Sequence, residues 1–435
     1  MSFESLDLPD FLLRSLETLG YAEATPIQAA SIPVALSGKD LLAAAQTGSG
    51  KTAAFCLPIV RKVTGEATAG KAPRHLILAP TRELAVQVGA ALERYAEGAP
   101  APVRVLVAFG GVGYDAQMKA AAAGVDVVVA TPGRLIDLVE RRSVELGEVQ
   151  TLVLDEADRL LALGFTEELN AIMEMLPEKR QNLLFSATFP QHVVALANAL
   201  LKDPERVELE AAAQPVASVA QRAIEVEGNK RTGLLRHLLE AEGWERVLVF
   251  VGSKRRADNV TAKLSKNGIS ALALHGDMSQ DKRQRSLERF KQKKARVLMA
   301  TDVAARGLDI AGLPCVINYD LPRAAADYVH RIGRTGRAGQ GGVAISFVTD
   351  DMDAHFRQIE KKNKIDPIPR ERLEGFEPED WNPQDPNKGK APVKGKRPSK
   401  KDKLRRQASK GEDRPSGDGG DVSSPWVQAM RRGKR

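Results

Sequence analysis

The stretch from Leu41 to Thr52, LLAAAQTGSGKT, decides the fold of this 435-residue chain. It opens with Leu41–Ala45, an apolar run typical of a buried strand, and the helical pattern of Ala53–Pro58 follows it. A glycine-rich loop between a strand and a helix lets backbone N–H groups converge on phosphate oxygens, beside the favourable dipole of a helix N-terminus. The stretch therefore predicts a parallel α/β domain that binds a nucleotide phosphate.

Two side chains of this loop carry its expected chemistry. Lys51 is expected to neutralise the β- and γ-phosphates, and the Thr52 hydroxyl to bind Mg²⁺. Ala45 stands where the general phosphate-loop pattern has glycine, and an ordinary glycine-rich turn is the competing interpretation. A chance match to the relaxed pattern is expected in only about 3% of chains of this length. The predicted nucleotide-binding loop comprises Ala45, Gln46, Thr47, Gly48, Ser49, Gly50, Lys51 and Thr52.

A second chemical signal, Asp155-Glu156-Ala157-Asp158, follows the apolar run Thr151–Leu154. Asp155 is expected to bind Mg²⁺, usually through water, and Glu156 to orient and deprotonate an attacking water. The run could also be a plain acidic helix N-terminus, which is common. That alternative leaves the phosphate loop without a magnesium partner, so the two signals together predict a magnesium-dependent nucleoside triphosphatase.

The composition, with 43% hydrophobic and 28% charged residues, is that of a globular protein. No apolar run reaches the roughly 18 residues that a membrane span requires. Residues 1–10 are acidic and lack the pattern of a signal sequence. Cys56 and Cys315 each lie in an apolar stretch, which favours buried thiols over a disulfide. These features predict a cytoplasmic protein without membrane contact.

The positive charge of the chain is concentrated in its C-terminal tail. The net charge is +8, yet residues 385–435 contain 16 Lys or Arg against 6 Asp or Glu, a net of +10, and the rest is close to neutral. Aliphatic residues nearly vanish beyond Glu377, so residues 377–435 are predicted to be disordered. Such a tail adds phosphate affinity that does not depend on sequence.

Apolar runs alternate with helical patterns in two successive series, which predicts two parallel sheets covered by helices on both faces. The first series is Leu41–Ala45, His75–Ala79, Val103–Phe109, Val125–Ala130, Thr151–Asp155 and Asn182–Ser186. The second is Val247–Val251, Ala271–His275, Arg296–Ala300, Val316–Tyr319 and Val343–Val348. The alanine-rich residues 211–218 between the two series read as a flexible linker.

The phosphate loop, the acidic run, Ser186-Ala187-Thr188 and the stretch from His330 to Arg337, in that order, resemble the DEAD-box ATP-dependent RNA helicases. The similarity covers roughly residues 3–360 and implies two RecA-like lobes with ATP, Mg²⁺ and RNA in the cleft between them. The expected division is a Q-motif segment at 1–33, an ATP-binding lobe at 34–210, the linker at 211–218, a second lobe at 219–365 and the tail at 377–435. The compact core with a basic tail resembles the bacterial RhlE-type group in particular.

The resemblance also assigns nucleotide contacts outside the phosphate loop. Gln28, in Thr25-Pro26-Ile27-Gln28, looks like the family's adenine reader, because a carboxamide offers both a donor and an acceptor. An aromatic ring, Tyr21 or Phe3, would pack near the base. Asp309 resembles the residue of the second lobe that helps to recognise the ribose.

RNA contacts are implied at turns that offer hydroxyls, backbone N–H groups or arginines, where anions bind readily. Without an aromatic platform in these turns, we expect the backbone of the RNA to be recognised rather than its bases. The first lobe would contribute Pro80, Thr81, Arg82, Gly110, Gly111, Thr131, Pro132, Gly133 and Arg134. The second would contribute Ser253, Lys254, Gly276, Asp277, Arg285 and Thr301.

The resemblance implies that Arg334 and Arg337 act as arginine fingers for the γ-phosphate. They would complete a catalytic set with Lys51, Asp155 and Glu156. A coupling group would link this set to bound RNA. It consists of Asp158, Ser186, Thr188 and His330.

The implied activity is RNA-stimulated ATP hydrolysis coupled to local, non-processive separation of RNA duplexes or remodelling of RNA–protein complexes, by a monomer. Structured ribosomal or messenger RNA is the expected substrate class, with RNA-processing or ribosome-assembly proteins as partners. Two alternatives stay open: an ATP-gated RNA clamp or annealing chaperone driven largely by the basic tail, and a DNA-directed translocase.

Overall fold

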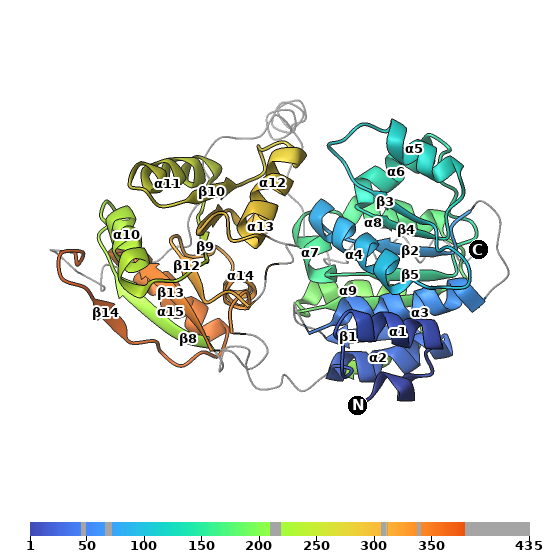
Figure 1. Ribbon diagram of the computed structural model, residues 1–435. Helices are drawn as coiled ribbons and strands as arrows, with labels where there is room; N and C mark the ends of the chain where they lie inside the picture. Colours follow the sequence, from blue (N-terminus) through green and yellow to red (C-terminus); the bar gives the residue numbers. More distant parts are fainter. Residues whose placement is uncertain are drawn as a thin grey trace, which may run out of the picture.

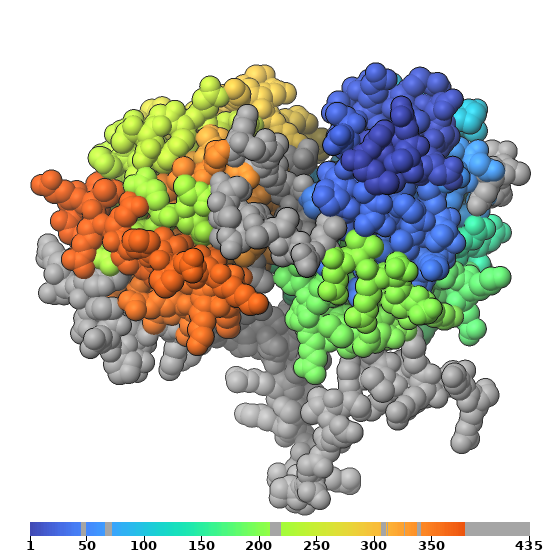
Figure 2. Space-filling view, turned by 90° about the horizontal axis from the view of Figure 1, so that it is seen from below, coloured from blue at the N-terminus to red at the C-terminus, as the bar shows by residue number. Residues whose placement is uncertain are grey.

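The computed structural model describes residues 1–44, 49–65, 72–208, 219–305, 310, 312–336 and 341–378. Within them the chain forms two seven-stranded sheets, one in each half (Figure 1). In the space-filling view the blue-to-green N-terminal half and the yellow-green-to-orange C-terminal half are two bodies that lie side by side (Figure 2). The predicted pair of parallel α/β lobes is therefore confirmed. The predicted linker 211–218 and nearly all of the predicted tail lie outside the described residues.

The first sheet has the strand order β3-β4-β2-β5-β6-β1-β7, and all its neighbours are parallel. Its strands are β1 (Leu41–Ala44), β2 (His75–Leu78), β3 (Val105–Ala108), β4 (Val127–Ala130), β5 (Thr151–Leu154), β6 (Gln181–Ser186) and β7 (Glu205–Glu208). The central strands β2, β4, β5 and β6 are buried along their whole length, which explains their continuous apolar sequence.

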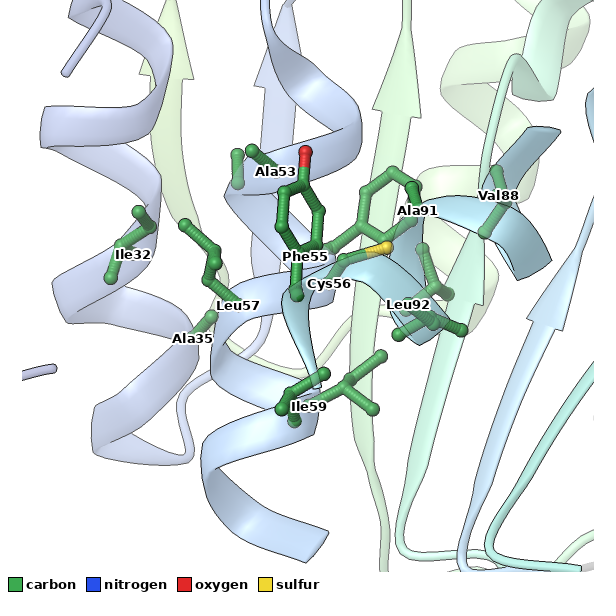
Figure 3. Close-up of a cluster of buried hydrophobic side chains, with 14 of the residues drawn as sticks. Ile32, Ala35, Ala53, Phe55, Cys56, Leu57, Ile59, Val88, Ala91 and Leu92 are labelled. Carbon is green, nitrogen blue, oxygen red and sulfur yellow. The ribbon is translucent and has the colours of Figure 1, made fainter. Parts of the chain in front are cut away.

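Helices cover both faces of this sheet. One face carries α1 (Asp10–Thr18), α2 (Pro26–Ser37), α3 (Lys51–Gly65) and α4 (Arg82–Tyr95), with η1 (Phe3–Leu6) at the N-terminus. The other carries α5 (Asp115–Ala122), α6 (Pro132–Glu140), α7 (Ala157–Ala162), α8 (Thr166–Met175) and α9 (Gln191–Leu200). Figure 3 shows α3 at the centre of the first face, where Phe55 and Cys56 lie among residues of α2 and α4. This packing holds the N-terminus of α3 at the nucleotide edge of the sheet.

The second sheet repeats this plan with the order β10-β11-β9-β12-β13-β8-β14, again all parallel. Its strands are β8 (Val219–Glu225), β9 (Val247–Phe250), β10 (Ala271–Leu274), β11 (Val297–Ala300), β12 (Cys315–Asn318), β13 (Gly342–Val348) and β14 (Arg370–Arg372). One face carries α10 (Arg231–Glu242) and α11 (Lys254–Lys266). The other carries α12 (Gln280–Lys291), α13 (Asp302–Ala305), α14 (Ala325–Ile332) and α15 (Asp353–Lys362), with η2 (Asp350–Met352) before α15.

Three strands were not expected from the sequence: β7, β8 and β14. All lie at or next to one edge of a sheet, where burial on both faces is incomplete and polar residues are tolerated. The last of them extends the second sheet beyond residue 365, the predicted end of that lobe. Both cysteines are buried and free, as predicted, and burial raises the pKa of each thiol.

Ion pairs hold the segment around β14 onto the second lobe. Arg370 contacts the carboxylates of Asp353 at 3.0 Å and Glu360 at 2.9 Å, whose side chains are only 2% and 6% exposed. Replacing Arg370 by Leu would leave two buried carboxylates without this counter-charge. We expect the variant to lose about 3 kcal/mol of unfolding free energy, measured by urea denaturation.

The matched control is Arg357→Leu, because Arg357 also contacts Asp353, at 2.8 Å, but is 66% exposed. It should cost less than about 1 kcal/mol. Equal losses of unfolding free energy in the two variants would show that burial of the β14 segment does not determine the cost of removing an arginine.

Candidate nucleotide site and nucleic-acid interface

The carboxyl ends of β1, β5 and β6 bring the predicted catalytic groups of the first lobe together, because these three strands are neighbours in the sheet. In a parallel sheet, ligands bind in the crevice outside these strand ends. Lys51 is the first residue of α3, shortly after β1, while Asp155 and Glu156 directly follow β5. Three segments that are distant in sequence thus meet at one edge.

Lys51 faces both carboxylates of the acidic run. Its Nζ atom lies 3.3 Å from Asp155 Oδ1 and 3.8 Å from Glu156 Oε1. The side chains are nearly inaccessible, at 6% exposure for Lys51, 0% for Asp155 and 8% for Glu156. One lysine and two carboxylates therefore share a site that is largely shielded from bulk water, where charges act strongly on one another.

The pKa shifts follow from this burial and pairing. Burial lowers the pKa of Lys51, but the charges of Asp155, Glu156 and Asp158 outweigh it, so the pKa lies above its ordinary value and the ammonium stays charged. For Asp155, burial raises the pKa and the Glu156 charge adds to this, while Lys51 opposes it. The carboxylates thus carry more negative charge than Lys51 alone can compensate.

The surroundings of Asp155 fit a divalent cation. Neither of its oxygens has a hydrogen-bond partner within the described part of the chain, although the carboxylate is fully buried. A hard cation such as Mg²⁺ binds carboxylate oxygens and would favour the charged form of Asp155 against the effect of burial on its pKa. The described residues contain no group of three or more His, Cys, Asp or Glu side chains that could hold a metal ion, so Asp155 would share the cation with the predicted Thr52 hydroxyl, phosphate oxygens and water.

Glu156 has an unusual backbone conformation. Its φ of 50° and ψ of 54° place it in the left-handed region, as the residue that precedes α7. A non-glycine residue pays a cost of about 1 kcal/mol or more for this conformation, and such strain concentrates at functional sites. The turn directs the chain from β5 into α7 while its side chain stays beside Lys51.

Gln28 holds the phosphate-loop end to the Q-motif segment. Its Oε1 accepts a hydrogen bond from the Thr25 backbone N–H at 2.9 Å, and its Nε2 donates to the Gly50 carbonyl at 3.0 Å. Gly50 has φ +93°, and a Cβ there would lie 2.4 Å from Gln28 Nε2, so only glycine permits this approach. The carboxamide thus contacts the C-terminal end of the phosphate loop directly, and its contact with adenine stays a prediction.

The two aromatic candidates for the base differ in accessibility. Phe3 is 5% exposed and lies in the core of the first lobe. Tyr21 is 42% exposed, and its ring lies 6.4 Å from that of Tyr95. Only Tyr21 offers an accessible ring.

The predicted coupling residues do come together. Thr188 Oγ1 donates to Asp158 Oδ2 at 2.7 Å, and Ser186 Oγ donates to the Thr188 carbonyl at 2.7 Å. His330 of the second lobe is within electrostatic range: burial and the Arg159 charge lower its pKa to about 4, against the opposing charges of Asp158, Glu156 and Asp327. The imidazole is therefore neutral at pH 7.

The predicted RNA contacts of the first lobe follow β2, β3 and β4, which form the other half of the same sheet edge. Thr81 caps α4 by accepting from the Leu84 N–H at 3.2 Å. Arg82 lies against Gly111, where φ is +83° and a Cβ would lie 2.1 Å from Arg82 Nη1. Thr131 and Pro132 begin α6. The edge is thus divided between nucleotide-binding and RNA-binding candidates.

Arg134 is placed differently from a direct RNA contact. It is 5% exposed, and its guanidinium donates to Gln117 Oε1 at 3.0 Å and to the Val112 carbonyl at 2.9 Å. It also lies 4.2 Å from the centre of the Tyr114 ring. The structure therefore gives Arg134 a supporting role beneath the loop that follows Gly111, and a contact with RNA stays a prediction.

The second lobe presents the equivalent strand ends, β9, β10 and β11. Ser253 caps α11 by accepting from the Arg256 N–H at 3.3 Å, and Lys254 pairs with Asp277. Thr301 follows β11 and lines a cleft between the lobes with a volume of about 1190 Å³.

On α12, Arg285 is exposed, while its neighbour Arg283 contacts Glu83 of the first lobe at 2.7 Å. Sequence reasoning missed Arg283.

A network of hydrogen bonds around the partly buried Asp320 also escaped sequence analysis. The carboxylate of Asp320 accepts from the Gly252 backbone N–H at 2.8 Å, from Arg231 at 2.6 Å and from Arg256 at 2.5 Å. Burial raises the pKa of Asp320, but the bonds and charges of these partners outweigh it, so the pKa is lowered. The network braces the second-lobe wall of the cleft, which these four residues line.

Several predicted residues lie outside the described part of the chain. They are Ala45, Gln46, Thr47, Gly48, Asp309 and Arg337. Arg334 is described and is 8% exposed; its backbone carbonyl accepts from the Leu313 N–H at 3.1 Å. In the described residues, no helix combines the length and the apolar character needed to cross a membrane.

Known sequence families match both lobes. Residues 25–196 match the DEAD/DEAH box helicase family, and residues 230–339 match the helicase conserved C-terminal domain. The DEAD-box ATP-dependent RNA helicase CshA of Bacillus cereus is 43% identical over 380 residues, which cover 86% of this chain and 71% of the relative. Its counterpart in Geobacillus kaustophilus is 44% identical over 363 residues, covering 83% and 77%.

Solved structures share the two-lobe arrangement. DEAD-box helicase Mss116 bound to single-stranded RNA and UDP-BeF matches with a TM-score of 0.77 and 29% identity, over 86% of this chain and 80% of that one. Dbp5 of S. cerevisiae bound to RNA and ADP-BeF3 matches with a TM-score of 0.74 and 29% identity, over 85% and 95%.

The two family matches, together with two parallel lobes and a lysine beside paired carboxylates at one sheet edge, define a two-lobed helicase. The chain belongs to the family of DEAD-box ATP-dependent RNA helicases.

Proposed function

We propose that this protein hydrolyses ATP when RNA is bound and uses the cycle to separate short RNA duplexes locally or to remodel RNA–protein complexes. The observation that carries the proposal is the buried group of Lys51, Asp155 and Glu156, which lies at the same sheet edge as the RNA-contacting candidates. Related structures that contain both RNA and a nucleotide analogue support a shared cleft.

In this proposal each charged group of the first lobe has a separate role. Lys51 neutralises the β- and γ-phosphates, while Asp155 and Thr52 hold Mg²⁺, which supplies charge stabilisation at the phosphates when bound. Glu156 accepts the proton of the attacking water. Gln28 selects adenine, with Tyr21 packing near the base, and Asp309 contacts the ribose.

The second lobe completes the site when it closes. Arg334 and Arg337 approach the γ-phosphate, which requires both lobes to be in place. Backbone N–H groups, hydroxyls and cations at the ends of β2, β3, β4, β9, β10 and β11 hold one RNA strand along both lobes. A strand held in this way does not keep duplex geometry, so closure displaces its partner strand. The coupling group that joins Asp158 to Thr188 and His330 relays RNA binding to the acidic pair.

The competing function is an ATP-gated RNA clamp or annealing chaperone that depends mainly on the tail. Release of a short labelled duplex distinguishes the two, measured with full-length protein and with protein ending at Pro378, each with ATP and with a nonhydrolysable analogue. Because β14 belongs to the second sheet, truncation must keep residues up to 378. A helicase core should release the duplex only with ATP. Release that persists without ATP and disappears with the tail would favour the chaperone.

The tail has its own expected effect on RNA affinity. Residues 385–435 carry a net charge of +10. Protein ending at Pro378 should bind single-stranded RNA more weakly, with a shallower dependence of log Kd on log salt, because fewer counterions are released. Fluorescence anisotropy between about 50 and 200 mM salt measures this slope. An unchanged slope would show that the tail does not contact RNA.

The biological setting is part of the proposal as well. We propose a cytoplasmic monomer, divided into segments 1–33, 34–210 and 211–218, a second lobe that runs from 219 through β14 (Arg370–Arg372), and a tail at 377–435. It would act on ribosomal or messenger RNA together with RNA-processing or ribosome-assembly proteins. The basic tail supports the assignment to the RhlE-type group, whereas the relatives described above carry the name CshA. Crosslinking in cells followed by sequencing of the bound RNA tests the substrate class.

A further inference from the structure

One ion pair joins the acidic run of the first lobe to the arginine-bearing helix of the second. Arg159 directly follows Asp158 in α7, and Asp327 lies in α14, the helix that carries His330 and Arg331. Arg159 Nη1 lies 2.7 Å from Asp327 Oδ1, and the two side chains are only 11% and 12% exposed. Both residues line the cleft between the lobes.

The second-lobe side of this contact is firmly held. Arg331, one turn after Asp327, donates to both carboxylate oxygens of Asp302, at 2.6 and 2.7 Å. The same guanidinium donates to Asn318 Oδ1 at 3.0 Å and to the Asp320 carbonyl at 2.7 Å. Helix α14 is thereby fixed to the ends of β11 and β12, so the contact at Asp327 positions the whole second lobe and not this helix alone.

The first-lobe side is equally constrained. The Arg159 backbone N–H donates to Asp158 Oδ1 at 3.1 Å, while Asp158 Oδ2 accepts from Thr188. In addition, α7 begins directly after Glu156, whose backbone is held in the left-handed region. Arg159 is thus linked through one short helix to the carboxylate that is proposed to activate water.

We propose that Arg159 and Asp327 are positioning residues, which set the second lobe in the register required for RNA-stimulated ATP hydrolysis. This inference rests on the function proposed above. Neither residue belongs to the predicted set of nucleotide, RNA or coupling contacts. The pair directly follows the acidic run, and it holds α14, whose last residue, Ile332, lies two residues before Arg334.

The pair is well suited to a register function. Planar guanidinium groups form directional contacts with carboxylates, unlike the point charge of lysine. With both side chains mostly buried, a mispaired charge would remain poorly hydrated, so wrong registers are penalised. A pair of this kind contributes more to selecting one arrangement than to the stability of either lobe alone.

A charge swap tests the proposal. We expect Arg159→Glu and Asp327→Arg each to lower the kcat of RNA-stimulated ATP hydrolysis by about 5- to 50-fold, which lies within the range of typical couplings between contacting residues. The KM for ATP should change by less than about 2-fold, because the pair lies outside the nucleotide contacts. The double variant should recover to within about 3-fold of the wild type. Arg159→Lys should retain part of the activity.

The matched control swaps Lys293 and Glu245, a pair at 2.7 Å that is 61% and 71% exposed in the second lobe. Neither its single variants nor its double variant should change kcat. Thermal unfolding of every variant distinguishes a protein that misfolds from a folded protein whose lobes are wrongly placed. The neutral variants Arg159→Gln and Asp327→Asn replace any charged variant that fails to fold. Single variants with wild-type kcat, or a double variant no better than the singles, would overturn the proposal. A wild-type protein without RNA-stimulated hydrolysis would instead overturn the proposed function.

Discussion

Glu156→Gln is expected to lower the kcat of RNA-stimulated ATP hydrolysis by about 10²- to 10⁴-fold, the usual contribution of a general base. The amide keeps the size of the side chain but cannot accept the proton of the attacking water. Binding should survive, because Lys51 keeps its contact with Asp155 at 3.3 Å and the proposed magnesium ligands are untouched. Steady-state phosphate release measures kcat, and equilibrium titration measures the affinities for ATP and RNA.

The control for this variant is Glu167→Gln, because Glu167 is an exposed glutamate in the first turn of α8. It should behave like the wild-type protein. If Glu156→Gln kept its turnover, Glu156 would lose its proposed role. If it lost ATP binding as well, the residue would be a structural partner of Lys51 instead.

Arg334→Ala is expected to lower kcat by about 10³- to 10⁵-fold, the usual contribution of an arginine finger to phosphoryl transfer. Arg334 belongs to the second lobe and has a largely buried side chain. In the proposed cycle, its charge would reach the γ-phosphate and stabilise the transition state only when the lobes are closed. The affinity for ATP should change little, because the main nucleotide contacts are proposed to lie in the first lobe. For Arg337→Ala we likewise expect a large loss of kcat and little change in the affinity for ATP.

Arg236→Ala is the matched control, because Arg236 is half-exposed on α10 and contacts Glu240 at 3.7 Å within that helix. It should leave both kcat and the affinity for ATP unchanged. A large loss of ATP affinity in Arg334→Ala with a preserved kcat would argue that the residue binds nucleotide rather than the transition state.

The central strands of both sheets could be predicted because burial on both faces demands continuous apolar sequence. The strand β9 reads Val-Leu-Val-Phe and is buried throughout. By contrast, β7 reads Glu-Arg-Val-Glu, with only Val207 buried, and β14 reads Arg-Glu-Arg. These edge strands are held by backbone hydrogen bonds and ion pairs, which leave no apolar signal in the sequence.

The candidate site also contains contacts that could be predicted from the sequence and contacts that could not. The proximity of Lys51, Asp155 and Glu156 could be predicted, because the strand ends of one parallel sheet converge on one edge. The contacts Arg283–Glu83 and Arg159–Asp327 could not, because they depend on how two lobes face each other. The buried position of Arg134 was equally hidden, because an arginine in a turn has the same sequence signal whether it meets RNA or a neighbouring loop.

In the proposed cycle, ATP hydrolysis requires both lobes to be closed on RNA. The most direct measurement is the kcat for ATP hydrolysis at saturating ATP, with and without single-stranded RNA, and with DNA of the same sequence. We expect RNA to stimulate the kcat by at least about 10-fold, which corresponds to about 1.4 kcal/mol or more in the barrier, and DNA to stimulate it little. Equal rates with and without RNA would contradict this requirement.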